Sequence, residues 1–549
     1  MPSLFKFLCN KVEPGLRLVC GSWILMPWNS HYVADFPVVI VGAGPVGLTL
    51  ALGLAKQGIR SLILDKKERL DEHSRALIVV ARTLEVLESY GLAKAFLREG
   101  YFLRQLTLHD VDRREIVFEL SFHEITRETF YSGMLVLPQD RLERMILDQV
   151  LATGLCDVRF GHQLVSYKDY ADHVDVSFND NCGLLSTAGA SFLVGCDGAH
   201  STVRRLTGQE LKGTTFPIRV FLCDIKIADS LRDQLPFPRL QVSRSGLVGA
   251  IRYKPFHWRL LGPISANEKE DEAVSRARMS TLVSELLGPG TFDQLWAGVF
   301  SVHSRMAPSF RKGRILLAGD AAHISSPAGG QGMNSGMQDA HNLAWKLGCA
   351  LNGGDTEQLL SSYDQERRSA ITSFVLPFTT SLTRVALHPR LIPTALRLVR
   401  YVLQSRSFQR AAGRRLGMLG MRYKSSSLVF GEPKWAGRPA PGSGRSGLTL
   451  FCFGGSVLRV RELQELTISL QREYRLPPIA IRNVEQTESL WVQWQARPNL
   501  LAFVRPDGYV GWAAINPTRA ETSSAVRRAL GQQMLDKSPS VSQSMPDPV

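Results

Sequence analysis

The stretch Pro37–Asp65, PVVIVGAGPVGLTLALGLAKQGIRSLILD, decides how the first part of the chain folds. A β-branched run leads directly into Gly42-Ala43-Gly44-Pro45-Val46-Gly47, an apolar helix follows, and a second apolar strand ends in Asp65. This is the GxGxxG pattern in a βαβ setting, with an acidic residue roughly 20 positions on. A GxGxxG without this setting also occurs for packing reasons. With both strands and the acid present, the sequence predicts a dinucleotide site.

A second glycine-rich stretch, Gly313–Leu347, reads GRILLAGDAAHISSPAGGQGMNSGMQDAHNLAWKL. Its apolar run at 315–318 predicts a strand that ends in Gly319-Asp320, and the turn AGGQG at 328–332 opens a helix with an apolar stripe. A glycine loop at a helix start directs free N–H groups and a positive dipole end toward a ligand. Asp320 could instead cap the helix, but its place at a strand end favours ligand contact.

A third strand end lies in Phe192–Arg205, FLVGCDGAHSTVRR, where Asp197-Gly198 precedes a basic helix start. By itself this could be an ordinary Asp-Gly turn. In their order and separation, however, the three segments resemble the class A flavoprotein monooxygenases, the FAD-dependent aromatic hydroxylases, over roughly residues 38–430. Two smaller matches, Ser74-Arg75-Ala76 and Pro138–Glu143 (PQDRLE), support the resemblance.

The resemblance implies FAD as the cofactor and assigns a role to each motif. Asp65 departs slightly from the family, in which Glu is commoner at this point. By this resemblance, the pyrophosphate is bound by Gly42, Gly44 and Gly47, the adenosine side by Asp65 and Arg75, and the ribityl side by Gln139. The FAD hydroxyls are contacted by Asp197, Gly198 and Asp320, and Asp197 also lies beside an NADPH groove. The isoalloxazine is bordered by Pro327, Gly330, Gly332, Met333 and Asn334.

The resemblance also implies the chemistry. In the family, NADPH binds transiently and reduces FAD, O2 adds to give a flavin C4a-hydroperoxide, and its terminal oxygen attacks an electron-rich ring. We therefore expect an FAD-dependent, NAD(P)H-consuming monooxygenase that hydroxylates a phenolic or polyketide-like aromatic in secondary metabolism or aromatic catabolism. A flavin-dependent epoxidase of an alkene and a non-catalytic flavoprotein stay as alternatives. A halogenase is disfavoured because the sequence has no WxWxIP motif.

The substrate wall is predicted in segments that alternate apolar and polar residues, 110–134 and 211–300, as antiparallel strands do. The mixture of side chains in the second segment suits a planar, partly hydrophobic aromatic. The lining candidates are Phe221, Leu222, Tyr253, Phe256, His257 and Trp258. His257 and Tyr253 are weak candidates for the catalytic base, since a lone strand histidine is more often structural, so the catalytic residue stays unassigned.

The predicted fold class is α/β: a Rossmann-like FAD-binding domain interleaved with an antiparallel substrate sheet, followed by a C-terminal thioredoxin-like α/β domain. The last domain rests on resemblance to the phenol-hydroxylase branch; it lacks a CxxC, so we expect a structural or oligomerising role. The predicted segments are an extension at 1–36, the FAD-binding domain at 37–375, helices at 376–430 broken by Pro377, Pro389 and Pro393, a linker at 431–446, the thioredoxin-like domain at 447–535 and a disordered tail at 536–549.

Composition narrows the remaining options. A chain of 549 residues suits two or three domains, and its net charge of +15 comes from dispersed basic residues without a nucleic-acid motif, so we expect anionic small ligands and no nucleic acid. Eight cysteines without a CxxC, and scattered histidines, predict no metal site and a reducing, cytoplasmic location. The arginine-rich stretch 372–423 could touch a membrane, but we expect no such contact. A homodimer stays open. The nature of residues 1–36 also stays open: they could be native, a non-native extension, a targeting segment or a membrane contact.

Overall fold

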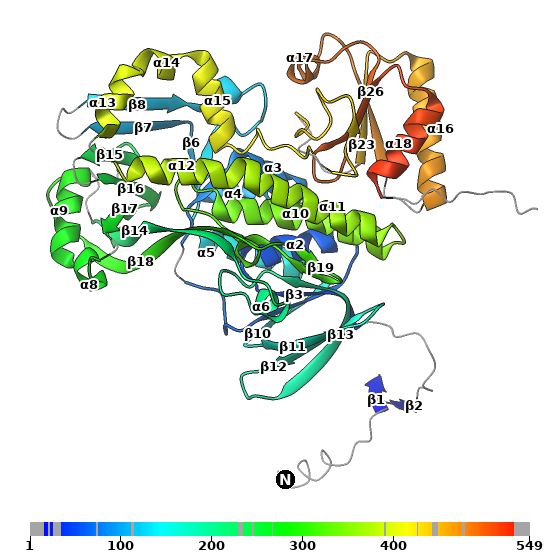
Figure 1. Ribbon diagram of the computed structural model, residues 1–549, viewed down its shortest axis with the longest axis horizontal. Coiled ribbons are helices and arrows are strands. Elements are labelled where there is room, and N and C mark those ends of the chain that lie inside the picture. Colours follow the sequence, from blue (N-terminus) through cyan, green and yellow to red (C-terminus); the bar gives the residue numbers. More distant parts are fainter. Residues whose placement is uncertain are drawn as a thin grey trace, which may run out of the picture.

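Figure 1 shows the computed structural model of the chain. The structure describes residues 16–19, 22–25, 35–72, 75–110, 115–228, 234–243, 246–265, 267–388, 391–424, 426–441, 448–474 and 478–531. The predicted tail at 536–549 and most of the predicted extension at 1–36 lie outside these residues, as do Ser74 and Pro389. Within the extension, β1 (Leu16–Val19) and β2 (Ser22–Leu25) pair antiparallel.

The first domain is built on an eight-stranded sheet whose centre is parallel. Its main path runs through β10 (Cys156–Phe160), β4 (Ser61–Asp65), β3 (Phe36–Val41), β13 (Leu185–Gly195), β12 (Val174–Asn179) and β11 (Gln163–Asp169), with β20 (Ile315–Leu317) on β13 and β19 (Arg311–Lys312) on β20. Val38, Val39 and Ile40 of β3 are fully buried, as expected of a parallel strand covered on both faces.

Five of these strands direct their carboxyl ends to the same edge of the sheet. β10, β4, β3, β13 and β20 pair in parallel, so β4, β3, β13 and β20 end together at Asp65, Val41, Gly195 and Leu317. The three motifs of the sequence are the loops that follow three of these strand ends. In open α/β sheets this edge is where ligands bind.

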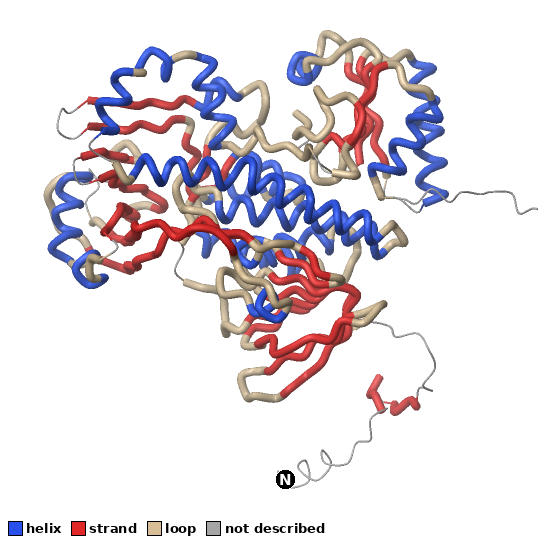
Figure 2. The backbone as a smooth tube through the Cα atoms, in the orientation of Figure 1, coloured by secondary structure: helices blue, strands red, loops and turns tan. Residues whose placement is uncertain are grey.

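Helices α2 (Pro45–Ala55) and α10 (Gly332–Leu351) start from this edge and pack on each other. Gly53 allows their close approach, because a Cβ at this position would lie 2.7 Å from the Cβ of Ala344. In Figures 1 and 2, α10, α11 (Thr356–Ala370) and α12 (Leu376–Ala386) cross the middle of the molecule between the parallel sheet and the C-terminal domain. The other helices of this part are α3 (Ala81–Ser89), α4 (Ala93–Glu99), α5 (Gln139–Ala152), α6 (Thr202–Leu206), and the 3-10 turns η1 (Phe122–Ile125) and η2 (Gly319–Ala321).

A second eight-stranded sheet forms the predicted substrate wall. Its order is β21 (His323–Ile324), β18 (Asp293–Met306), β14 (Lys212–Lys226), β17 (His257–Ser265), β16 (Gly246–Lys254), β15 (Arg239–Ser243), β7 (Gln105–Asp110) and β8 (Glu115–Ser121). All neighbours pair antiparallel except β15 and β7. Helices α8 (Glu270–Ala273) and α9 (Arg276–Leu287) lie beside this sheet (Figure 1). A three-stranded sheet of β5 (Ile78–Val80), β9 (Met134–Val136) and β6 (Tyr101–Leu103) links the two.

The predicted helix break at Pro377 is wrong. Helix α11 (Thr356–Ala370) continues through a π-helical turn, Ile371–Val375, into α12 (Leu376–Ala386). Proline lacks the N–H that an α-helix needs and clashes with the preceding turn, and a wider π turn just before it accommodates both defects. The predicted boundary at 375/376 therefore falls inside continuous helix. Beyond it lie α13 (Ile392–Leu398), with Pro393 in its first turn, α14 (Arg400–Gln404) and α15 (Arg406–Leu416).

The arginines of this helical segment pair with acidic residues of the main body. Glu128 accepts from Arg410 at 2.7 Å and from Arg414 at 2.8 Å, and Arg397 pairs with Asp110 and Glu115. These ion pairs hold α13 and α15 against the main body. No helix in the described part of the chain is both long and apolar enough to span a bilayer.

The C-terminal domain contains a five-stranded mixed sheet. Its order is β22 (Phe430–Gly431), β26 (Val510–Ile515), β25 (Leu500–Val504), β23 (Leu448–Phe453) and β24 (Ile479–Val484), accompanied by α16 (Val457–Tyr474), α17 (Ser489–Trp494) and α18 (Arg519–Ala529). Part of the predicted linker 431–446 belongs to this domain, because Gly431 pairs with Ala513 and the buried side chains of Trp435 and Ala440 pack in its core.

Candidate active site

The three glycines of the first motif are required for two different physical reasons. A Cβ on Gly42 would lie 2.4 Å from the carbonyl oxygen of Cys196, and one on Gly47 would lie 1.9 Å from the carbonyl oxygen of Gly42. A Cβ on Gly44 would meet nothing within 4 Å. Gly42 and Gly47 therefore permit close backbone packing, whereas Gly44 leaves open space directly in front of α2. This helix start has no side-chain cap and no acidic residue in its first turn, so it suits an anion.

Asp65 braces the glycine loop. Its Oδ2 accepts a hydrogen bond from the backbone N–H of Ala43 at 2.7 Å, and its Oδ1 accepts from the N–H of Lys67 at 2.9 Å. The carboxylate is half-buried and stands at the carboxyl end of β4, beside the glycine loop. Its predicted contact with a ribose hydroxyl stays a prediction, for which each oxygen has a second lone pair.

Asp197 is in part a helix cap. Its Oδ2 accepts from the backbone N–H groups of Thr202 at 2.6 Å and Val203 at 3.2 Å, at the start of α6. Its Oδ1 is buried and has no hydrogen-bond partner among the described residues. Gly198 follows in the left-handed region with φ 77°. Any contact of Asp197 with FAD or with an NADPH groove is left to Oδ1, a buried acceptor that needs a donor.

Asp320 projects from the end of β20 without a hydrogen bond to any described residue. Gly319 before it has φ 62° and packs against Val46 of α2, since its Cβ would lie 2.8 Å from a methyl of that side chain. Desolvation by the surrounding protein raises the pKa of Asp320, and His323 and Arg75 partly oppose this. The residue is still reached by solvent, although Ala321, Ala322 and His323 after it are buried. Its carboxylate oxygens can therefore accept hydrogen bonds from a ligand.

The loop before α10 lies at the same edge of the sheet, where α10 contacts η2. The start of α10 has no side-chain cap and no acidic residue in its first turn. Pro327 is exposed, and Gly330, Gly332 and Met333 are half-exposed. The side chain of Asn334, in contrast, is fully engaged: Oδ1 accepts from the N–H of Val80 at 3.0 Å, and Nδ2 donates to the carbonyls of Ile78 and Gly330 at 2.8 and 2.7 Å. Both polar groups of its side chain are therefore bonded to the protein backbone, and its predicted place at the isoalloxazine border stays a prediction.

The structure also brings Arg75 and Gln139 to this edge. Gln139 accepts from the N–H of Ala76 through Oε1 at 3.2 Å and donates from Nε2 to Glu143 at 2.8 Å. Its side chain thus supports the backbone next to Arg75. Glu143, which holds the Gln139 side chain in place, was not predicted from the sequence; burial raises the pKa of the Glu143 carboxyl to about 7.

One of the two faces of the substrate sheet lies against this edge, and the strand register identifies which face it is. Phe221 and Trp258 are fully buried in a cluster with Met279 and other side chains of α9, so their prediction as lining residues is wrong. Side chains alternate along a strand, and the neighbours therefore point the other way. On that opposite face lie Leu222 and Asp224 of β14, Tyr253 of β16, Arg259 of β17 and Trp296 and Phe300 of β18.

A buried ion pair that sequence reasoning missed joins this face to the cofactor edge. Arg259 donates from Nε and Nη2 to the two oxygens of Asp224, both at 2.7 Å, and from Nη1 to the carbonyl of Arg75 at 3.1 Å. The guanidinium of Arg75 lies 5.3 Å from the centre of the Phe300 ring. The sequence signal that could have indicated this ion pair is a charged residue inside an otherwise apolar strand.

The two candidates for a base occupy different positions. His257 is at the turn between β16 and β17, and its Nδ1 lies 2.7 Å from the carbonyl oxygen of Pro255, which fits a structural role. Tyr253 is half-buried on the lining face, and burial, followed by Asp224, raises its pKa. A hydroxyl that stays protonated can donate a hydrogen bond but is a poor base. The structure therefore assigns neither residue as the base.

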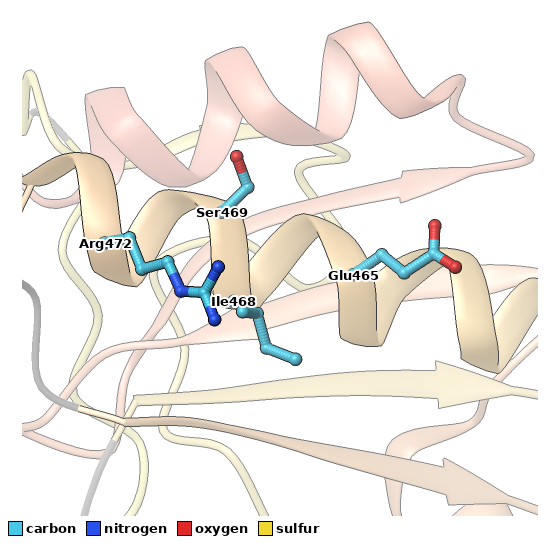
Figure 3. A pocket seen from close by; sticks show the side chains of 4 residues that line it. All are labelled: Glu465, Ile468, Ser469 and Arg472. Carbon is cyan, nitrogen blue, oxygen red and sulfur yellow. The ribbon is translucent and has the colours of Figure 1, made fainter.

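A second hollow lies away from the cofactor edge. Figure 3 shows a hollow of about 570 Å3 lined by Glu465, Ile468, Ser469 and Arg472, which all belong to α16. It is open, lies in the C-terminal domain and contains none of the motif residues. The part of the chain that the structure describes contains no group of three or more His, Cys, Asp or Glu side chains that could hold a metal ion.

The edge of the parallel sheet fits FAD in its own geometry. It offers open space at Gly44, two uncapped helix starts, the solvent-facing carboxylate of Asp320 and the unsatisfied Oδ1 of Asp197. The pyrophosphate needs the N–H donors and room for close approach, and the sugar and ribityl hydroxyls need acceptors. The residues present supply each of these.

Comparison with known proteins agrees with this geometry. The family described as FAD binding domain matches residues 35–376. The chain is 33% identical to 6-methylpretetramide 4-monooxygenase of Streptomyces rimosus over 74% of each chain, and 33% identical to a 3-(3-hydroxy-phenyl)propionate/3-hydroxycinnamic acid hydroxylase of Mycolicibacterium gilvum (strain PYR-GCK) over 68% of this chain and 66% of that protein.

Solved structures extend the likeness to nearly the whole fold. The anhydrotetracycline hydroxylase from Streptomyces rimosus, 27% identical, superposes with a TM-score of 0.70 over 91% of this chain and 100% of its own. Aklavinone-11 hydroxylase in complex with FAD and aklavinone, 23% identical, shares the fold with a TM-score of 0.77 over 91% of this chain and 99% of its own. The chain therefore belongs to the FAD-binding aromatic hydroxylases, a family of flavin-dependent monooxygenases.

Proposed function

We propose that this enzyme hydroxylates a phenolic, polyketide-like aromatic, with NADPH as the reductant and O2 as the oxygen donor. One observation carries the substrate class: the face of the second sheet that borders the cofactor edge is aromatic with a few fixed polar groups. Such a lining suits a planar, partly hydrophobic ligand better than a sugar or a highly charged metabolite. Relatives named for hydroxylation of phenolic acids and tetracycline precursors support the same class.

The chain would hold FAD along the carboxyl edge of the parallel sheet. The α2 start and Gly44 would bind the pyrophosphate, Asp65 and Arg75 the adenosine side, and Asp320 a ribityl hydroxyl. Gln139 would act through the Arg75–Ala76 backbone that it supports. Bound and reduced FAD supplies the activation of O2, because no side chain can perform this step.

The substrate would lie between the α10 loop and the lining face. Leu222, Trp296 and Phe300 would contact the ring system, and the Tyr253 hydroxyl, which stays protonated, would donate a hydrogen bond to a substrate oxygen. The Asp224–Arg259 pair would fix the position of the lining strands relative to Arg75. We assign no side chain as the base that activates the phenol.

The C-terminal sheet and its helices form, in this proposal, a thioredoxin-like domain over residues 447–535, without redox chemistry. β23 pairs in parallel with the edge strand β24 and antiparallel with β25, β25 pairs antiparallel with β26, and α16 and α18 pack together. Cys452 is buried on β23, and burial raises the pKa of its thiol, so the reactive thiolate is disfavoured. A structural role follows.

A product screen tests the proposal. The FAD-loaded enzyme is incubated with NADPH and O2 over a panel of simple phenols, polycyclic polyketides and isoprenoid alkenes, and products are identified by mass spectrometry. The proposal predicts substrate-stimulated NADPH oxidation and hydroxylated aromatics. Epoxidised alkenes with no hydroxylated aromatic would contradict it, and so would flavin-loaded protein that never oxidises NADPH faster with any aromatic.

A further inference from the structure

A chain of buried charges lies directly beneath the cofactor edge. Asp339, in the middle of α10, is fully buried, and its Oδ2 accepts from the N–H of Gly319 at 3.0 Å and contacts Nε2 of His323 at 2.7 Å. Its Oδ1 accepts from Nε of Arg367 at 2.6 Å. Oδ2 therefore supports the loop that presents Asp320, and Oδ1 binds Arg367.

Arg367 contacts the second element that borders the cofactor. Its Nη2 donates to the carbonyl of Ser335 in the first turn of α10 at 3.2 Å, and its Nη1 donates to Oη of Tyr423 at 3.0 Å. The side chain is fully buried. One guanidinium thus holds the Gly319–Asp320 loop, through Asp339, and the start of α10 in fixed relative positions.

The same chain continues into the C-terminal domain. The Tyr423 ring stacks on that of Tyr509, with centroids 4.0 Å apart. Arg505, on the same turn as Tyr509, donates to both oxygens of Glu366 at 2.6 and 2.9 Å, and Glu366 is the neighbour of Arg367 in α11. The Arg505-Pro506-Asp507-Gly508 turn of the sequence is therefore more than a hairpin turn, because it closes a buried network.

Buried ion pairs are weak evidence for stability, since well-packed apolar residues of similar volume are often as stable. What fully hydrogen-bonded buried charges provide is fixed geometry, and a cofactor site needs its binding groups within a fraction of an ångström. The network lies where such accuracy matters. The network contacts Gly319 on one side and Ser335 on the other. These residues adjoin the two segments expected to bind the flavin, the Asp320 turn and the loop before α10.

We propose that Asp339 and Arg367 are positioning residues for FAD, and that Tyr423 and Arg505 make the C-terminal domain part of the same support. They do not touch the cofactor; they set the distance and orientation between Asp320 and the N-terminus of α10. The proposal rests on the placement of FAD at this edge and not on the identity of the substrate, so failure of the substrate screen leaves it intact.

The test compares Arg367→Lys with Arg368→Lys, its neighbour on α11, whose guanidinium is partly exposed and pairs with Asp364 at 3.3 Å. Lysine keeps the charge but cannot form the same fork of hydrogen bonds. We expect Arg367→Lys to raise the Kd for FAD about tenfold or more, equivalent to loss of one charge-assisted hydrogen bond, and to alter the visible circular dichroism of the bound flavin. Arg368→Lys should change neither.

A merely structural role gives a different result. Arg367→Lys would then lower the melting temperatures of the apo and FAD-loaded proteins equally, with unchanged Kd and flavin spectrum, and this would overturn the proposal. Tyr423→Phe removes only the hydroxyl that accepts from Arg367 and keeps the stack, so it serves if Arg367→Lys does not fold. Tyr423→Phe and Arg505→Lys should shift the Kd and the spectrum in the same direction; unchanged values in both would remove the C-terminal domain from the support.

Discussion

Replacement of Asp320 by Asn should change FAD affinity and apo-protein stability in opposite directions. The carboxylate has no hydrogen bond to a described residue, and desolvation raises its pKa, with His323 and Arg75 only partly opposing this. An acid whose pKa is raised in the folded state binds more protons folded than unfolded between its two pKa values. Folding stability therefore falls as pH rises through that window, and the ionised group costs stability above it.

The expected magnitudes differ between the two effects. A charge-assisted hydrogen bond from a ribityl hydroxyl is worth about 1.5–3 kcal/mol, so Asp320→Asn should weaken FAD binding about tenfold to a hundredfold at pH 7. The apo-protein should become slightly more stable at pH 7, since the amide carries no charge to desolvate. This gain is small because solvent still reaches Asp320.

The assay is a fluorescence titration of apo-protein with FAD, together with thermal unfolding of the apo-protein at pH 4, 5.5 and 7. The wild-type advantage in affinity should shrink as pH falls and Asp320 becomes protonated, whereas the variant should show no such pH dependence from this position. Equal Kd values for the two proteins at pH 7 would refute the placement of Asp320 against the ribityl chain. A destabilised apo-variant would refute the claim that the carboxylate has no structural partner.

Three further predictions separate binding from folding. Gly44→Ala should fold normally but lose most FAD affinity, whereas Gly47→Ala should lower the apo-protein melting temperature, because a Cβ on Gly47 would lie 1.9 Å from a carbonyl oxygen. A lower melting temperature for Gly44→Ala than for Gly47→Ala in differential scanning fluorimetry, together with a greater loss of FAD affinity in Gly47→Ala by titration, would contradict the assignment. Glu366→Gln leaves buried Lys346 without its counter-ion and leaves Arg505 with Asp507 alone, so it should cost about 3–5 kcal/mol in urea unfolding, against less than about 1 kcal/mol for the exposed Glu357→Gln; equal costs would refute the buried network. Trp296→Ala should release more H2O2 per NADPH with normal FAD content, and unchanged coupling would remove it from the substrate wall.

The pH dependence of the Glu366 contribution has the opposite sign to that of Asp320. Burial alone would raise the pKa of Glu366, but Arg505 and Lys346 outweigh it and hold the pKa below its ordinary value. A depressed folded pKa gives stability that is present above the unfolded pKa and lost as pH falls below it. The cost of Glu366→Gln should therefore shrink in acid.

The sequence predicted the cofactor edge because its motifs follow strands, and parallel strands end together. Gly42, Asp197 and Gly319 are separated by more than a hundred residues, yet the order β4, β3, β13, β20 brings their loops side by side. Local patterns also marked α10. They did not show that the side chain of Asn334 is occupied by β5, since that contact spans 254 residues.

The substrate wall and the network show what local patterns leave out. A period of two sorts the residues of a strand into two sets, but does not say which set faces the ligand. Packing of α9 determines which set is which. Phe221 and Trp258 lie on the face that packs against α9, whereas Leu222 and Arg259 lie on the opposite face, which borders the cofactor edge. Likewise, nothing near Arg505 in the sequence indicates Glu366, which lies 139 residues away.

The central claim is that this chain inserts one oxygen atom from O2 into an aromatic substrate. Its most direct test is a single reaction of the FAD-loaded enzyme, NADPH and the best aromatic of the screen under 18O2 in unlabelled water. We expect a hydroxylated product that carries one 18O atom, formed with consumption of one NADPH, and no label when the 18O is supplied as water. Oxygen derived from water, or NADPH consumption that yields only H2O2, would contradict it.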